Sequence, residues 1–354
     1  MKPDATHFLR DILRQPEELR RTLEQLAKEG LPGVRTGAAA LRGSSELYLT
    51  GIGSSWHAAL TVAPMFYGSG RPVYLVEASE LVHFAQFRAA GTMVVISRSG
   101  RSVEIVQLVE KAQQAGVKVV GVTNAADGFL AKRADFSVLV PVALDHAISV
   151  NTYTTLAAAT GVLVQETLAG KLEASSLLRA IELAGQAVPG WRAQLADSKW
   201  ITPRKTTYFL ARGGSLGSAH EARLLWEEGV KAPATAMGTG SFRHGPQEMV
   251  REGMRFGIWL DSSRMRSQDL AVARDLEKLG ASVMLVGQSV SRSAAQLVFD
   301  LPPLPGEWQF LVDGIPSQLA AELLARVSGE DSDTFRLCSY VVEDESGLLG
   351  EARP

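Results

Sequence analysis

Residues 92–102 read Thr-Met-Val-Val-Ile-Ser-Arg-Ser-Gly-Arg-Ser, an apolar run that passes directly into a turn rich in serine. The run over 92–97 is typical of a buried β-strand, and a helix is predicted over 102–115. The turn between them is therefore predicted to join a strand to a helix. Repeated strand–helix pairs of this kind build parallel α/β sheets.

The same alternation continues on both sides of this stretch. Strands are predicted at 46–50, 72–77, 92–97 and 118–123, and helices at 55–67, 80–88 and 102–115. A leading helix over 8–27, with a possible break at Pro16, and a buried helix over 153–170 are also predicted. The alternation predicts an α/β fold with a mostly parallel sheet covered by helices on both faces.

The two halves of the chain resemble each other. Residues 47–54 line up with 208–215, and residues 92–121 line up with 255–286, in the same order. The pattern predicts two similar αβα sandwich domains that arose by duplication, although a shared strand–helix rhythm alone could imitate it. We predict a helical segment over 1–29, a first domain over 30–187 and a second domain with the C-terminal tail over 188–354. The boundary is placed where a polar segment over 187–204 begins.

Composition restricts the class of protein. The chain has 354 residues, a net charge of -2 and a single cysteine, Cys338. The charge gives no basic surface for nucleic acid or an anionic membrane, and one cysteine cannot form a disulfide within the chain. The N-terminus lacks the pattern of a signal peptide. We therefore expect a cytoplasmic protein with neither nucleic acid nor membrane as a partner.

The turn at 97–102 has the chemistry of a phosphate site. Ser97, Ser99 and Ser102 each offer a hydroxyl donor, and Gly100 permits close approach of the backbone. Backbone N–H groups without partners at the start of the following helix favour an anion. Serines are also common helix N-caps, which is the simpler interpretation. The counterpart turn at 261–263 begins with an acid and lacks the glycine, so one phosphate site per chain is predicted, in the first domain.

A second strand–helix turn, Gly-Ile-Gly-Ser-Ser over 51–55, does not complete a dinucleotide-binding pattern, because Trp56 stands where the third glycine would be. Turns that follow neighbouring parallel strands converge at one edge of a sheet. Ser54 and Ser55 are therefore predicted to add hydroxyls to the same sugar phosphate.

Isomerising a sugar needs a group that moves a proton between adjacent carbons and an acid or base at the ring oxygen. The second half offers Glu221, Glu227 and Glu228 on one predicted helix and, before a Gly-Pro pair, His244. Imidazole gives and takes protons near neutral pH. Glutamates are also common on helix surfaces, and the histidine could simply hydrogen-bond its turn.

Taken in order, these motifs resemble the sugar isomerase (SIS) family. The resemblance is to its double-domain members, which include the isomerase part of glucosamine-6-phosphate synthase, glucosamine-6-phosphate deaminases and fructosamine-6-phosphate deglycases. Residues 53–58 are similar to the family's G-T-S-Y-H-A, and residues 97–102 to its S-Q-S-G-E-T. Residues 122–124 and 133–135 are similar to its T-N and R-A-D pattern, and Arg212, Gly213, Glu221, Glu228 and 244–246 fall at its spacings.

The resemblance implies roles for these residues. The phosphate would be held by Ser55, Ser97, Ser99 and Ser102, with Ser54 nearby. Glu228 would move the proton between C1 and C2, and His244 would open the ring. In the family that histidine comes from the neighbouring subunit, which implies a homodimer with shared active sites. No cofactor and no metal ion are expected.

The chain departs from the family pattern at three places. It starts at the isomerase portion, without the synthase's glutamine-hydrolysing domain and its N-terminal cysteine. The tail over 331–340 has no lysine where the synthase has one. Arg98 and Arg101 stand where the family has a neutral and usually an acidic residue. They could contact the substrate, by gripping its phosphate or a second anionic group, or be solvated residues at the start of the helix.

Three functions follow as hypotheses. The first is a deaminating isomerase that converts glucosamine 6-phosphate to fructose 6-phosphate and ammonia. The second is a deglycase acting on a fructosamine 6-phosphate, with Arg98 or Arg101 meeting an amino-acid carboxylate. The third, from another class, is a non-catalytic sugar-phosphate sensor, although no DNA-binding or partner module is visible in residues 1–30.

Overall fold

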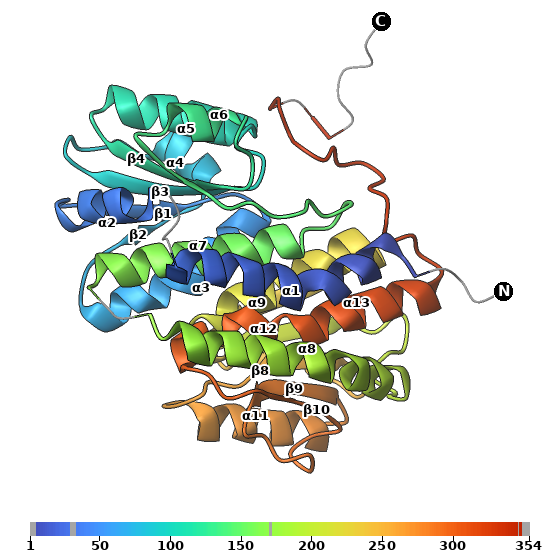
Figure 1. The fold of residues 1–354 in the computed structure, drawn as a ribbon. Coiled ribbons are helices and arrows are strands. Elements are labelled where there is room, and N and C mark those ends of the chain that lie inside the picture. The colour runs from blue at the N-terminus through green and yellow to red at the C-terminus, as the bar shows by residue number, and fades with distance from the viewer. Residues whose placement is uncertain (1–4, 29–32, 170–171, 346, 349–354) are drawn as a thin grey trace, which may run out of the picture. The chain divides into compact units, whose positions relative to one another are not determined.

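The computed structural model describes residues 5–28, 33–169, 172–345 and 347–348 (Figure 1). The chain divides into two compact units. The first domain comprises Arg21–Ala174 together with the segment from Thr334 onward, and the second comprises the segment up to Arg20 together with Ser175–Asp333. The division falls within the N-terminal helix α1 (His7–Lys28).

The first domain is built around five parallel strands in the order β2-β1-β3-β4-β5. The strands are β1 (Leu47–Thr50), β2 (Tyr74–Leu75), β3 (Thr92–Ser97), β4 (Lys118–Thr123) and β5 (Phe136–Leu139). The helices are α2 (Val34–Arg42), α3 (Ser54–Ser69), α4 (Ala78–Phe84), α5 (Val103–Gln114), α6 (Phe129–Arg133) and α7 (Asn151–Thr167).

Helices cover both faces of this sheet. Figure 1 shows α5 and α6 on one side and α3 and α7 on the other, and α2 packs against α7. All six residues of β3 are buried, as expected for a central parallel strand. Met93 and Val95 point into a cluster with Ile105 and Leu108 of α5. The sheet therefore holds the end of β3 rigidly between two apolar layers.

The second domain has a sheet of the same kind, in the order β7-β6-β8-β9-β10. Its strands are β6 (Thr207–Ala211), β7 (Ala234–Gly238), β8 (Arg255–Trp259), β9 (Ser282–Gln288) and β10 (Leu297–Leu301). Its α-helices are α8 (Ala174–Ala196), α9 (Ser215–Leu225), α10 (Thr239–Phe242), α11 (Arg266–Lys278), α12 (Phe310–Asp313) and α13 (Ile315–Ser328). Shorter helical turns are Trp226–Val230, Pro246–Met249 and Gly306–Trp308.

The two strand orders are identical once each is numbered from its own first strand. β1 and β3 correspond to β6 and β8, the two pairs of segments that align in the sequence. A shared rhythm of strands and helices does not by itself impose the same spatial order, so the match favours duplication. The predicted fold class, two αβα units with parallel sheets, is confirmed.

Two predicted interruptions are absent. Pro16 lies inside α1, which is continuous over His7–Lys28. The predicted domain boundary at 187–188 falls inside α8, which includes Pro189 and Gly190. An apolar stripe explains why α8 continues to Ala196, since Val188, Trp191 and Leu195 are buried at helical spacing. Burial of that stripe outweighs the backbone hydrogen bond that a proline removes.

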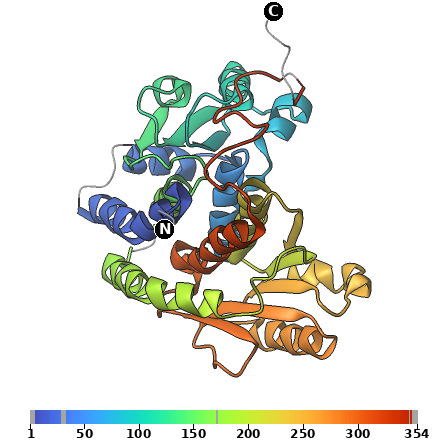
Figure 2. The ribbon, with the colours of Figure 1, turned by 90° about the vertical axis from the view of Figure 1, so that its right-hand side faces the viewer.

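The C-terminal tail also differs from its predicted place. We predict it in the second domain, whereas the described residues from Thr334 onward belong to the first (Figure 2). Its contacts with the first domain, described below, involve residues almost 200 to more than 240 positions earlier, which no local pattern reveals. Among the described helices, none is long and apolar enough to cross a membrane.

Candidate active site

The serine-rich turn lies at the switch point of the first sheet. β1 pairs with β3, and the chain leaves β1 toward β2 but leaves β3 toward β4. The turns that follow β1 and β3 therefore diverge to opposite faces of the sheet. In open parallel sheets the crevice between such turns is the usual place for a ligand.

Hydrogen bonds within the turn define its shape. The amide of Gly100 donates to Ser97 Oγ at 3.0 Å, and the amide of Arg101 donates to Ser99 Oγ at 3.2 Å. Gly100 has φ +61°, and a Cβ there would lie 3.0 Å from the Cβ of Leu130. Leu130 in turn donates its amide to the Gly100 carbonyl at 3.0 Å. The turn thus needs glycine at this position for both its conformation and its packing.

Two hydroxyls beside the turn keep their hydrogen-bonding capacity. Ser102 is the N-cap residue of α5, and its side chain makes no capping bond. Ser55 lies in the first turn of α3, and Ser54 is the first residue of that helix. Within the described part of the chain, no group bonds the hydroxyl of Ser55 or Ser102. A cap-only role for Ser102 is thereby disfavoured, since a capping serine would bond an amide of the helix.

The C-terminal tail reaches this turn, a contact that no motif in the sequence predicts. The Arg98 guanidinium lies 3.8 Å from the ring centroid of Tyr340 and donates to its carbonyl at 2.5 Å. The Tyr340 hydroxyl donates to the Asp145 carbonyl at 3.2 Å. The amide of Val103, first in α5, donates to the carbonyl of Val342 at 3.0 Å. The tail is therefore fastened beside the serine hydroxyls.

The two arginines of the turn already have protein partners. Arg98 also donates to Ser149 Oγ at 3.0 Å, in addition to its contacts with Tyr340. Arg101 is exposed and forms an ion pair with Asp127. Both guanidinium groups are thus engaged by other residues of the protein.

Glu228 lies in the second domain, on a widened turn of helix. Trp226–Val230 is a π-helix that continues α9, and Trp226, Gly229 and Val230 in it are buried. Such turns are rare and occur often at functional sites. Glu228 is half-buried, whereas its neighbour Glu227 is exposed and pairs with Arg223 at 2.6 Å. Lys231 ends the turn in the left-handed conformation and donates to the Glu228 carbonyl.

Glu221 and His244 differ in their exposure to solvent. Glu221 is buried in α9, at 3% exposure. His244 is exposed, and its amide donates to the Ser241 carbonyl at 3.0 Å. Gly245, at φ +128°, turns the chain sharply after it. No described residue hydrogen-bonds the imidazole, so the ring is held out to solvent on a rigid turn.

The corresponding turns of the second domain are filled by the protein's own carboxylates. Asp313 accepts hydrogen bonds at 2.6 Å from Ser215, the counterpart of Ser54, and from Ser218. Asp261 accepts from the amides of Ser263 and Met265 in the turn after β8. A bound anion would meet two negative charges there. This arrangement supports the expectation that the phosphate site lies in the first domain.

Asp313 provides a prediction about stability. Complete burial raises the pKa of this carboxyl from 3.8 to about 6, although hydrogen bonds from Ser215 and Ser218 act in the opposite direction. The folded protein therefore holds a proton that the unfolded chain releases near pH 4, and the free energy of unfolding falls as pH rises from about 4 to about 6. Asp313→Asn should remove this loss, which is on the order of 3 kcal/mol.

Denaturant unfolding at pH 4, 6 and 8 measures the effect. The exposed Asp275 gives a matched control, and Asp275→Asn should follow the parent protein at each pH. If Asp313→Asn and the parent lost stability in parallel over this range, the assignment of the titration to Asp313 would be wrong.

Metal binding finds no support among the residues described. No three His, Cys, Asp or Glu side chains in residues 5–28, 33–169, 172–345 and 347–348 are grouped as a metal ion requires.

The fold is that of a doubly wound α/β protein with two units of the same strand order. A turn lined with serines lies at the switch point of the first domain's sheet. Residues 40–165, which lie within the first domain, match the family model of the SIS domain. The family resemblance predicted from the motifs is confirmed.

Three similar proteins are named as enzymes of amino-sugar or fructose 6-phosphates. A curated relative is a glutamine–fructose-6-phosphate aminotransferase (isomerizing) of Pyrobaculum aerophilum, 26% identical over 96% of this chain and 58% of its own length. The chain thus spans little more than half of that relative. Among solved structures, the C-terminal domain of glucosamine-fructose-6-phosphate aminotransferase from Francisella tularensis has a TM-score of 0.81 at 18% identity, covering 94% of this chain and 99% of its own. Glucosamine-6-phosphate deaminase from Thermotoga maritima has a TM-score of 0.80 at 19% identity, covering 95% and 99%.

Proposed function

We propose that this chain is a phosphosugar isomerase that acts on an amino-sugar 6-phosphate and releases its nitrogen as ammonia. The observation that carries the proposal is the pair of turns after β1 and β3, where the hydroxyls of Ser55 and Ser102 have no hydrogen-bond partner among the described residues and lie at the N-termini of α3 and α5. A dianionic phosphate matches that set of donors. The names of the relatives, all enzymes of hexose 6-phosphates, support the same class of substrate.

The proposed phosphate contacts come from both turns at the switch point. Ser55 and Ser102 donate their hydroxyls directly. Ser97 and Ser99 use their oxygens to accept turn amides, which leaves each hydroxyl proton free to point toward the phosphate. Gly100 keeps the backbone close, and Ser54 begins the helix whose dipole faces the anion.

Glu228 and His244 are the proposed proton-transfer groups. Once the ring is open, Glu228 takes the proton from C2 of glucosamine 6-phosphate and returns it to C1. The nitrogen at C2 is then an imine, which water hydrolyses to a ketone with release of ammonia. His244 serves the ring oxygen, and its exposure agrees with a histidine that works in a neighbouring subunit's site. We therefore propose a homodimer in the cytoplasm as the working form.

The arginine contacts favour deamination over the deglycase alternative. A deglycase substrate carries an amino-acid carboxylate, which needs its own cation. Arg98 is engaged by Tyr340 and Ser149, and Arg101 by Asp127. Neither is left to meet a second anion.

Product analysis with the full chain tests the proposal. Glucosamine 6-phosphate should yield fructose 6-phosphate and ammonia in equal amounts, whereas fructosamine 6-phosphates should release no free amino acid. A thermal-shift series with the same compounds gives an independent measure of binding. A ligand present at 100 times its Kd stabilises the fold by about 2.7 kcal/mol.

The outcomes separate the alternatives. Amino-acid release from a fructosamine 6-phosphate would establish the deglycase instead. Binding of a hexose 6-phosphate with no product from any of them would make the protein a sensor. If no hexose 6-phosphate shifted the melting temperature, the phosphate site itself would be refuted.

A further inference from the structure

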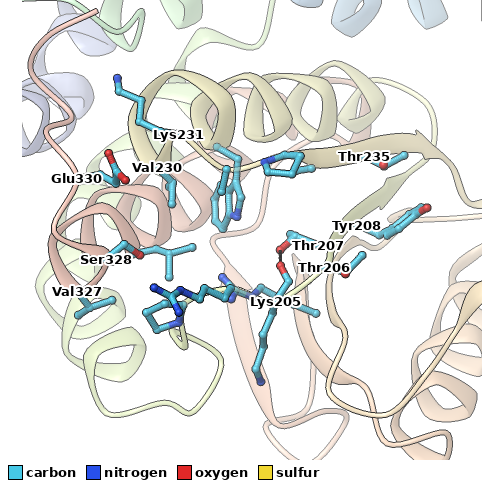
Figure 3. Close-up of a pocket in the computed structure, with 18 of the residues that line it drawn as sticks. Lys205, Thr206, Thr207, Tyr208, Val230, Lys231, Thr235, Val327, Ser328 and Glu330 are labelled. Atoms are coloured by element: carbon cyan, nitrogen blue, oxygen red, sulfur yellow. Dashed lines mark hydrogen bonds between the residues drawn. The ribbon is translucent and has the colours of Figure 1, made fainter. Parts of the chain in front are cut away.

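A large cavity in the second domain lies apart from the turns described above. Its volume is about 970 Å³, and its wall includes Thr207 and Tyr208 of β6, Ala234 and Thr235 of β7, and Arg255 of β8 (Figure 3). These are the first residues of three neighbouring parallel strands. The cavity thus lies at the amino edge of the sheet, whereas the Asp313 and Asp261 contacts lie beyond its carboxyl edge. Its size is that of a pocket for a small organic molecule.

One wall of the cavity contains a buried cation that has no counter-charge among the described residues. The Arg255 side chain is 0% exposed. Its Nη2 donates to the Thr202 carbonyl and its guanidinium lies 4.9 Å from the ring centroid of Trp200, but Nε and Nη1 have no hydrogen-bond partner among the described residues. Burying a charge is costly unless it is paired. This charge therefore requires an explanation.

The surroundings of Arg255 add positive charge. Burial lowers the pKa of Arg255 to about 10. Burial and repulsion by Arg255 lower the pKa of Lys205, whose ammonium donates to Ser282 Oγ at 3.2 Å. Among the described residues that line the cavity, four are basic and one, Glu330, is acidic. The cavity is therefore electropositive.

Most of the other lining residues are apolar or aromatic, and the remainder are threonines and a serine. Trp226 and Val230, the two ends of the π-helix that carries Glu228, face it together with Leu324 and Val327 of α13. Figure 3 shows Val230, Val327 and Ser328 around one side and Thr207 and Thr235 on the other. A ligand that complements this wall has an apolar or aromatic body.

We propose that this cavity binds a small organic anion, with its acidic group toward Arg255 and its apolar part against Trp226. The occupant contacts both ends of the turn that presents Glu228. The site does not depend on the reaction proposed above, because it is defined by charge and shape in the second domain alone. Its failure would leave the isomerase proposal untouched.

Titration of the full chain with the aromatic anion 1-anilinonaphthalene-8-sulfonate tests this. The probe should bind at one saturable site per chain, with energy transfer from tryptophan, and the neutral N-phenyl-1-naphthylamine should bind more weakly. Ser328→Glu places a negative charge in the wall, whereas Ser328→Gln has the same size without the charge. We expect Ser328→Glu to weaken the sulfonate probe at least about tenfold and Ser328→Gln to change it less than about twofold.

Arg255→Met removes the charge itself and should weaken the probe to a similar extent. If Arg255→Met does not fold, the two Ser328 variants still test the proposal. Ser328 is exposed at the end of α13, so both substitutions should leave the fold intact. Equal affinity of the sulfonate for Ser328→Glu and Ser328→Gln would overturn the proposal. So would equal binding of the neutral and the anionic probes to the parent protein.

Discussion

Glu228→Gln is expected to lower kcat for glucosamine 6-phosphate by about 10²- to 10⁴-fold while changing KM little. Glutamine keeps the size and the polar end of the side chain but cannot take a proton from carbon. The widened turn is held by buried Trp226, Gly229 and Val230, so the substitution should leave its shape unchanged. The assay is release of ammonia and fructose 6-phosphate.

Glu227 offers a matched control one residue away. It lies on the same π-helix but is exposed and paired with Arg223. Glu227→Gln should keep turnover within about twofold of the parent. With ammonia present to form the C2 imine, exchange of the C1 proton of fructose 6-phosphate with deuterated water, followed by NMR, isolates the proton-transfer step; it should be lost in Glu228→Gln and kept in Glu227→Gln. Full exchange in Glu228→Gln would show that another group moves the proton.

The parts of the fold that follow from local pattern were predictable. β3 and β4 have the predicted bounds, because a central parallel strand is buried on both faces and reads as an unbroken apolar run. Edge strand β2 is only two residues long, far shorter than the run predicted over 72–77. At the edge one side of the strand has no partner, and hydropathy alone does not report where pairing ends.

Long-range packing was not predictable from the same signals. The polar segment over 187–204 predicted a domain boundary, but the burial of Trp191 and Leu195 keeps α8 intact through it to Ala196. The π-helix leaves no signature in the residues 226–230, because it depends on how α9 ends against α13. The tail contact with Arg98 joins residues more than 240 positions apart.

The candidate site also has a part that the local sequence predicts and a part that depends on distant segments. The serine turn is local, and its glycine, hydroxyls and following helix are all readable in residues 97–102. The contacts of Arg98 and Arg101 could not be predicted from the turn itself, since their partners Tyr340 and Asp127 come from other segments. The contact of the Asp313 carboxylate with the second domain's turn was likewise not predictable, because Asp313 lies 98 positions from Ser215.

Ser102→Asp should abolish useful binding of hexose 6-phosphates, with Kd raised by about 100-fold or more. Ser102 is the N-cap of α5, and aspartate is as good an N-cap as serine, so the helix should be retained. The new carboxylate would stand where the proposed phosphate accepts the serine hydroxyl, and the two charges repel. Calorimetric titration with glucosamine 6-phosphate and fructose 6-phosphate measures the loss.

Ser102→Asn separates charge from shape. Asparagine is close in size to aspartate, also caps helices well, and carries a donor instead of a charge. Its Kd should rise by less than about tenfold, leaving at least a further tenfold between the two variants. The comparison tests the anion and not the tail, because the tail bonds the backbone amide of Val103, which neither substitution alters. Equal affinities for Ser102→Asp and Ser102→Asn would mean that the phosphate binds elsewhere, and the turn after β3 would then be only the cap of a helix.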